Sequence, residues 1–250
     1  MSRRVNEATQ LALLDKAEVV DAAWRVRTSE RARRLTVRVF PGGQVEVVVP
    51  RGTRPRAVQQ FVARHRSWID RKVALYRPRD AMPGEADLPE VIRFRANGAC
   101  WRVERLEAPG APQLVVDGDR LLLLGDPARS ALARHILQRF TMRMAHAVLV
   151  PALEKLAEAH GLRFAHAQIR RQRTRWGSCS RRGTISLNAC LVFQAPEVVN
   201  YLLLHELAHT RHPDHSRRFW GLVGQLEPDW RELDAVLARG WREVPRWVLR

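Results

Sequence analysis

The chain has 250 residues, 46% of them hydrophobic, enough for one large domain or two small ones with a substantial core. No stretch approaches the ~20 apolar residues of a membrane span, and the first residues do not read as a secretory signal. The three cysteines, Cys100, Cys179 and Cys190, are an odd number and include no Cys-x-x-Cys pair. They therefore indicate neither a disulfide framework nor a thiolate zinc site. We therefore expect a cytoplasmic, reducing location and no association with a membrane.

The formal net charge is +17, and arginine carries nearly all of the positive charge. Two interpretations stay open. Guanidinium groups bind phosphate bidentately, so the excess is what contact with nucleic acid or another phosphate would require. A high-GC genome also favours Arg codons over Lys codons, and the richness in Ala and Val agrees with that explanation. Nucleic acid is therefore a candidate partner that composition alone does not establish.

The first half of the chain is predicted to be rich in β-strands. Residues 1–23 are polar with a weak helical period, and we expect a loose extension there. Apolar residues then alternate with polar ones over 35–39 and 45–49, on either side of a Pro-Gly-Gly turn, which predicts a β-hairpin. An amphipathic helix is expected from about Pro55, and the stretch 77–89 is expected to be a loop or linker.

A second group of strands follows, and an Asp-Gly pair between the last two indicates a hairpin. These strands are expected over residues 91–94, 100–106, 114–116 and 121–124. Asp126 and Pro127 are typical of a helix start, and the helical stripe that follows is expected to kink at Pro151 and to end at Gly161. We therefore expect a β-rich region over 24–125 and a catalytic region over 126–250.

The stretch from His205 to His209 reads HELAH, an HExxH motif, on an apolar helix predicted to begin at Pro196 and to end before Pro213. Residues four apart lie on one face of a helix, so both imidazoles can bind one metal ion. Glu206 lies beside that ion, where it can take a proton from a bound water. The motif predicts a hydrolase with one zinc ion per chain, held by His205 and His209, and with Glu206 as the catalytic base.

Catalytic zinc usually has three protein ligands and one water, so a third ligand is expected. His212 and His215 are the candidates. His212 lies three residues past His209 at the helix end, and its ring would point partly away from the metal. His215 follows a turn at Pro213, which lets the chain fold back toward the metal. We favour His215.

Two further features bear on the substrate. Residues 184–187 are predicted to form a strand directly before the HExxH helix. This strand is either an ordinary sheet strand or the edge strand with which an extended substrate pairs. The candidate oxyanion stabilisers are an arginine run or an unidentified backbone amide. The run consists of Arg170, Arg171, Arg173 and Arg175.

Short stretches along the chain form a series from about Val26 to Leu237. In order they are TSERARRLTVRV, VEVVVP, FVARHRSWI, RWGSC, ISLN, HELAH and DHSRRFW. This series resembles the YgjP-like family of zinc metallopeptidases, which is related to the SprT-like peptidases. The resemblance implies an α+β fold in which a β-rich N-terminal half precedes a zincin-like metallopeptidase domain. It also implies that His215 is the third metal ligand beside His205 and His209, and that Glu206 is catalytic.

We therefore predict a zinc-dependent metallopeptidase acting on a peptide or protein. One alternative is a metal-dependent hydrolase of a nucleotide phosphoanhydride, against which the sequence lacks a carboxylate-rich magnesium site and a Gly-rich phosphate loop. The other is a protease that acts on nucleic-acid-bound protein, as in the SprT-like relatives. Basicity favours that alternative, although no zinc finger or helix-turn-helix signature accompanies it. The sequence indicates neither the natural substrate nor the oligomeric state.

Overall fold

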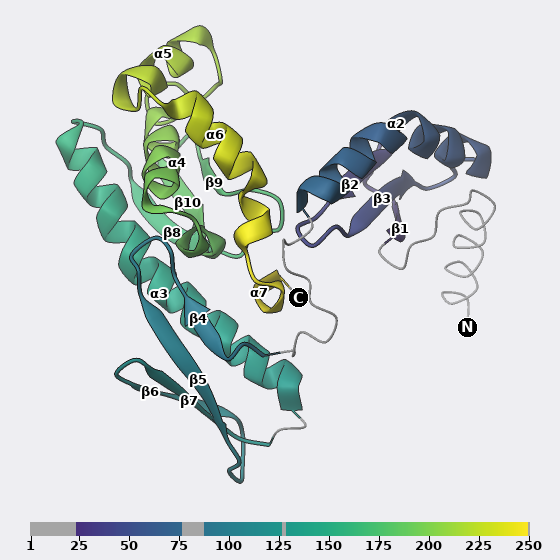
Figure 1. The fold of residues 1–250 in the computed structure, drawn as a ribbon. Helices are drawn as coiled ribbons and strands as arrows, with labels where there is room; N and C mark the ends of the chain where they lie inside the picture. The colour runs from purple at the N-terminus through teal and green to yellow at the C-terminus, as the bar shows by residue number, and fades with distance from the viewer. Residues whose placement is uncertain (1–23, 77–87, 127–128, 250) are drawn as a thin grey trace. The chain divides into compact units, whose positions relative to one another are not determined.

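The computed structural model describes residues 24–76, 88–126 and 129–249 (Figure 1). The chain divides into two compact units, residues 1–79 and residues 80–250, and each unit is described by itself. The expected extension over 1–23, most of the expected linker and the expected first-turn Pro127 lie outside the described residues. Both units combine strands with helices, so the predicted α+β fold class is confirmed.

Over residues 24–76, the first unit is a three-stranded sheet packed against one helix (Figure 1). Its elements are β1 (Trp24–Ser29), β2 (Thr36–Val39), β3 (Val45–Pro50) and α2 (Pro55–Tyr76). The central strand β3 pairs antiparallel with β2, as the predicted hairpin requires, and parallel with β1. Valines at alternate positions of β2 and β3 face α2, where Val39 and Val45 form a buried core with Ile69.

The second unit begins with a four-stranded sheet of order β4-β5-β7-β6, in which β5 and β7 are parallel. The strands are β4 (Val91–Arg93), β5 (Cys100–Leu106), β6 (Gln113–Asp117) and β7 (Arg120–Leu124). All four predicted strands are present, and β6 and β7 form the predicted hairpin. The sheet contacts the long helix α3 through β6 (Figure 1). The functional division into regions 24–125 and 126–250 stays a prediction.

The long helix α3 (Ser130–Ala159) connects the two sheets of the second unit. It continues through Pro151 as one helix, and the amide of Leu162 donates to the carbonyl of Ala157 beyond its end. Gly161 adopts a positive φ of 59° there, so the predicted glycine stop is confirmed. The buried face of α3 contacts the strand β8, the 3₁₀ turn η2 (Ala189–Phe193) and the helix α4.

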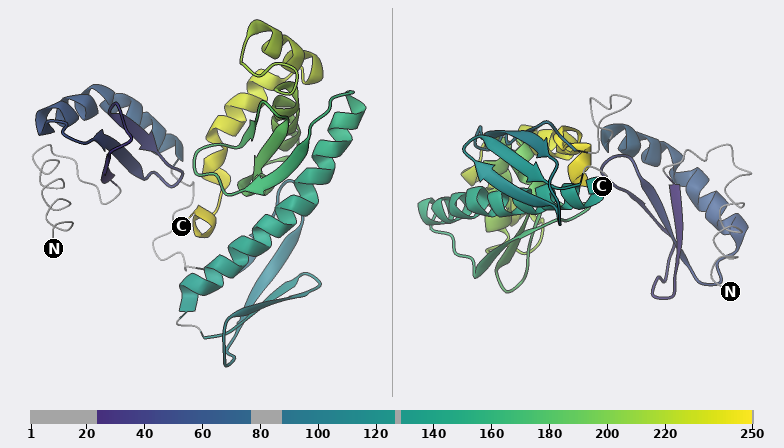
Figure 2. Two further views of the ribbon diagram at one scale, coloured as in Figure 1. Left: turned by 180° about the vertical axis from the view of Figure 1, so that it is seen from behind. Right: turned by 90° about the horizontal axis from the view of Figure 1, so that it is seen from below.

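The second sheet of this unit has the order β8-β10-β9 (Figure 2). Its strands are β8 (His166–Arg170), β9 (Gly177–Cys179) and β10 (Thr184–Asn188). β10 is the strand predicted over 184–187, and it is central because it pairs with β8 on one side and β9 on the other. Of the two alternatives left open for this strand, the ordinary sheet strand is therefore the one observed. The edges are β8, which contacts α3, and β9, which contacts α4.

The HExxH motif lies at the end of α4 (Pro196–Ala208), which begins at the predicted proline. This helix is buried on nearly every side. Its core residues before the motif are Val198, Val199, Tyr201, Leu202, Leu203 and Leu204. Its regular part ends at Ala208, and a turn closed by bonds from Arg211 and His212 to the carbonyl of Ala208 leads to Pro213. The helix thus stops five residues before that proline, since its last turn tightens first.

Three helices and one 3₁₀ turn complete the second unit. They are α5 (Arg217–Leu226), α6 (Trp230–Arg239), η3 (Gly240–Glu243) and α7 (Arg246–Leu249). Ser216 caps α5 by accepting a hydrogen bond from the amide of Phe219. Trp220 of α5 stacks on Trp230 of α6 with ring centroids 4.3 Å apart. Among the described helices, none is both long and apolar enough to cross a membrane.

Candidate metal centre

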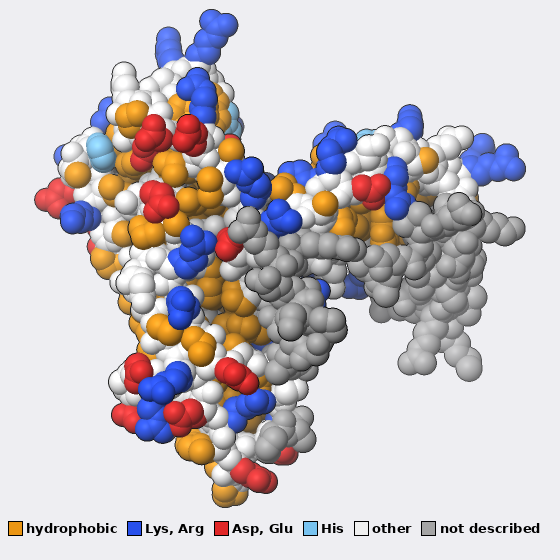
Figure 3. All heavy atoms as spheres, viewed as in Figure 1, with side chains coloured by type: hydrophobic (Ala, Val, Ile, Leu, Met, Phe, Trp, Pro, Cys, Tyr) orange, Lys and Arg blue, Asp and Glu red, His pale blue; other side chains and the backbone are white. Residues whose placement is uncertain are grey.

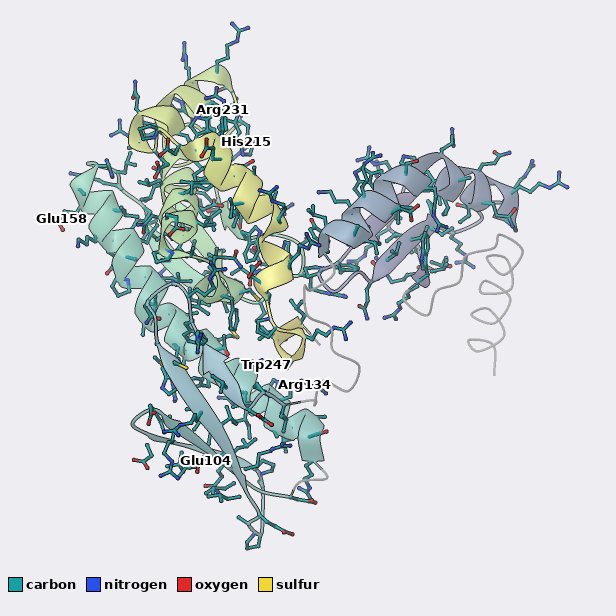
Figure 4. All side chains as sticks on the ribbon, in the orientation of Figure 1. Glu104, Arg134, Glu158, His215, Arg231 and Trp247 are labelled. Atoms are coloured by element: carbon teal, nitrogen blue, oxygen red, sulfur yellow. The ribbon has the colours of Figure 1, made fainter. Side chains whose placement is uncertain are left out.

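Three histidines meet at the C-terminal end of α4. His205 and His209 lie one helical turn apart on α4, and His215 lies in the loop before α5, at the end of the unit where Figure 4 labels it. One nitrogen from each ring lies within 4.8 Å of the other two. The Nε2 atoms of His205 and His215 are 3.3 Å apart. Two nitrogens bound at about 2.05 Å to one tetrahedral zinc ion are themselves about 3.3 Å apart, so the spacing fits.

The other ring nitrogen of each α4 histidine already has a partner. Nδ1 of His209 lies 3.1 Å from the carbonyl oxygen of His212, so it carries the hydrogen and donates. Nδ1 of His205 lies 3.4 Å from the hydroxyl of Tyr201, which in turn donates to Oδ1 of Asp234 at 2.9 Å. These contacts leave both Nε2 lone pairs for the centre. They are the outer partners that orient histidine ligands in metal sites.

The surroundings of His205 and His209 favour their neutral form. Burial, and then the neighbouring His209 and His215, lowers the pKa of His205 to about 3. Burial also lowers the pKa of His209. The buried ring of Phe219 lies against all three imidazoles, with centroids 4.3 Å from His209 and 4.9 Å from each of the others. A neutral imidazole is the form that binds a metal, so these surroundings suit the ligand role.

Glu206 is buried, with only 4% of its surface exposed. Its Oε2 atom has no hydrogen-bond partner, which is rare for a buried oxygen. Such an atom indicates a site at which a water molecule or a cation binds. Burial raises its pKa to about 8, and the positive charge of Arg175 acts in the opposite direction. Gly177 of β9 lies directly against this side chain, because a Cβ there would clash with Oε1 of Glu206.

The stretch leading into β9 is fixed by the buried side chain of Asn188. Its amide donates to the carbonyls of Gln172 and Arg175, at 2.7 Å each, and its oxygen accepts from the amide of Cys190 at 3.1 Å. The indole of Trp176 donates to the carbonyl of Leu237. The RWGSC and ISLN stretches therefore act together as the support that holds Gly177 against Glu206.

The arginine run has divided roles. Arg171 donates to the side chain of Gln138 at 2.8 Å and to the carbonyl of Val248 at 2.9 Å, and it thereby ties α3 to α7. Arg170 donates to Gln168 on its own strand. Arg175 is the member of the run whose charge acts on Glu206. Arg171 thus has a structural role, and Arg175 is the member of the run with an effect on the centre.

The structure brings the three predicted histidines together, and His212 contributes its carbonyl rather than its ring. Their role as metal ligands, and that of Glu206 as the base, stay predictions. Sequence reasoning missed the outer residues. Tyr201 precedes His205 by four residues, so helical spacing was a usable signal. Asp234 and Gly177 come from distant elements, and nothing local in the sequence connects them to the motif.

A helix that presents two histidines, a third histidine from the following loop and a buried glutamate beside them form the arrangement of metal-dependent hydrolases. The YgjP-like family model, described as a metallopeptidase domain, matches residues 33–240. The chain belongs to this family. The family places it among the metal-dependent peptidases and implies a bound metal ion.

One solved structure was also similar, the crystal structure of the metallopeptidase zymogen of Pyrococcus abyssi abylysin. It is 26% identical over 36% of this chain and 90% of that chain, with a TM-score of 0.33. That TM-score is too low for the likeness to support an inference. A comparison with curated proteins gave no match.

Proposed function

We propose that the protein is a zinc-dependent peptidase whose single metal ion is held by His205, His209 and His215. Three neutral nitrogen donors at this spacing suit zinc, which catalytic sites bind with three protein ligands and an open position. A bound zinc ion would supply Lewis acidity and lower the pKa of water at the site. Tyr201 and the carbonyl of His212 hold the rings in the binding tautomer.

Glu206 acts as the general base in this proposal. Its unpartnered Oε2 accepts the proton of the attacking water and then passes it to the leaving amine. Burial holds the pKa of this carboxyl group at about 8 even with the charge of Arg175 nearby, so the group is mostly neutral near pH 7. A cation among the three histidines would favour the ionised form that a base requires, and the charge of Arg175 acts in the same direction.

The strand best suited to bind an extended peptide is β9. It is an edge of its sheet, it contacts α4, and its first residue, Gly177, touches Glu206. A peptide paired with this edge would run past the general base, with its backbone groups satisfied by the strand. The phosphoanhydride alternative loses one of the arginines that motivated it, since Arg171 is engaged with Gln138 and Val248.

The buried, unpartnered carboxylate beside three converging histidines is the observation that carries this proposal. We expect Glu206→Gln to keep about one zinc per chain and to lose peptide hydrolysis by ~10²–10⁴-fold or more, because Gln cannot accept the proton. Zinc content by elemental analysis and turnover of a peptide library are the two measurements. Wild-type turnover in this variant on a confirmed substrate would refute the mechanism.

A further inference from the structure

The positive charge of the chain is concentrated in the first unit. Residues 24–76 hold thirteen Lys and Arg against three Asp and Glu. The described part of the second unit holds twenty-four against sixteen. More than half of the excess positive charge therefore lies in about a quarter of the described residues. A codon bias that acts on the whole chain would spread the excess in proportion to length.

The three carboxylates of residues 24–76 are already paired with arginines. The pairs are Glu30 with Arg51 at 3.1 Å, Glu46 with Arg27 at 3.6 Å, and Asp70 with Arg66 at 3.0 Å. Ten further Lys and Arg residues lie in this described stretch, where no other acidic side chain is present to balance them.

Strand register gathers six arginines at one end of the sheet. Ser29 ends β1 and Pro50 ends β3, and these residues are partners in the parallel pair. The loops that follow them therefore leave the sheet side by side, as the contact between Arg51 and Glu30 also shows. The exposed arginines of this end are Arg31, Arg33, Arg34, Arg51, Arg54 and Arg56. The 22-residue helix α2 begins here without an acidic residue in its first turn, which adds to the positive potential.

The outer face of α2 continues this surface away from the sheet end. It consists of Arg56, Gln60, Arg64, Trp68 and Arg71, whose spacing of three or four residues places them on one helical face. All five are exposed, and Trp68 is exposed by 39%. Figure 3 shows Lys and Arg side chains projecting from this unit. The next residue, Ile69, points the other way and is buried in the core.

We propose that this α2 face, together with the arginine-rich loops, binds single-stranded nucleic acid, with the arginines on phosphates and Trp68 stacked on a base. An exposed aromatic ring among arginines is what an unpaired strand requires, because every base has a face that can stack. A helix that lies on a lipid surface needs a broad apolar face, and this outer face has one aromatic residue and no aliphatic one. This activity is separate from the proposed peptidase chemistry and does not depend on it.

The test uses the full chain and a fluorescein-labelled oligonucleotide, with binding followed by anisotropy at ~50 and ~200 mM salt. The test variant is Arg56→Ala, Arg64→Ala and Arg71→Ala together. The matched control removes three exposed arginines of the second unit, through Arg93→Ala, Arg139→Ala and Arg163→Ala. Both variants lose the same charge, and thermal unfolding checks that each is folded.

We expect the α2 variant to bind at least tenfold more weakly at the lower salt, and the control to stay within about twofold of wild type. The slope of log K against log salt should fall by about 2 in the α2 variant, at about 0.7 per lost phosphate contact. Trp68→Ala should weaken binding about tenfold while leaving the salt slope unchanged, and Trp68→Phe should retain most of the affinity, because stacking is lost only in the first.

Three results would overturn the proposal. The wild type could fail to bind the oligonucleotide at the lower salt, or the control variant could lose as much affinity as the α2 variant. The chain could also bind vesicles of phosphatidylcholine and phosphatidylglycerol, and not the oligonucleotide, with the same dependence on the α2 arginines. That last result would assign the surface to anionic lipid instead.

Discussion

Two histidines only three residues apart contribute to the centre in different ways. His212 offers its backbone carbonyl to Nδ1 of His209, whereas His215 brings its Nε2 to within 3.3 Å of that of His205. We expect His215→Ala to lose zinc to a competing chelator, because only two ligands remain. His212→Ala should keep zinc, since a carbonyl is still present. Elemental analysis after dialysis against the chelator distinguishes them, and the reverse order would move the third ligand to His212.

The hydroxyl of Tyr201 gives a second test at this scale. It lies between Nδ1 of His205 and the carboxylate of Asp234, and removing it leaves the ring in place. We expect Tyr201→Phe to weaken zinc affinity by about 10–100-fold, the usual cost of losing an outer partner of a histidine ligand. Competition with a chromogenic chelator measures this without any substrate.

Asp234→Asn is the companion variant, because an amide can still accept from the Tyr201 hydroxyl and should cost less than Tyr201→Phe. Wild-type affinity in Tyr201→Phe would show that the hydroxyl does not orient His205.

Between elements, the contact of β9 with α4 sets the position of the general base. A methyl group at Gly177 would overlap the carboxylate of Glu206, so Gly177→Ala must push that side chain away. We expect peptide hydrolysis to fall by about 10²-fold, as misplacing a catalytic group by ~1 Å does, with zinc content unchanged. Steady-state turnover and zinc analysis together report on this.

Gly221→Ala on α5 is the matched control, because a Cβ there meets nothing within 4 Å. Equal activity in the two glycine variants would mean that the contact between β9 and Glu206 does not matter for catalysis.

Element by element, the sequence predicted what depends on local spacing. Alternating valines predicted β2 and β3. The four-residue spacing of His205 and His209 predicted that both rings lie on one face of α4. Strand order was not predictable in this way. The alternation of Ile185 and Leu187 indicates a strand, but it does not say whether one or both of its edges are paired. The edge strand beside α4, β9, is three residues long and has no apolar alternation.

The same limit applies to the centre. Its candidate ligands lie on one helix and the loop after it, so local spacing predicts them. Gly177 and Asp234 reach the centre only through tertiary packing. A sequence pattern of period two or 3.6 cannot report such contacts, because they join elements that are far apart along the chain.

For the molecule as a whole, each unit has its own core. Val39, Val45 and Ile69 are the core of the first unit, and the metal centre belongs entirely to the second. We therefore expect zinc removal to increase amide hydrogen exchange in α4, α5 and the loop between them, and to leave peptides from residues 24–76 unchanged. Mass spectrometry of the zinc-loaded and chelator-treated chain measures this. Increased exchange in β1–β3 would contradict independent units.

The placement of the three imidazoles also has a consequence for the order of events during folding. All three come from the short stretch between His205 and His215, so gathering them closes only a small loop and costs little chain entropy. Gly177 and Asp234 must arrive by longer closures. A refolding chain should therefore acquire its metal early and its hydrolytic activity later, with a lag between the two that measures how long the distant elements take to dock.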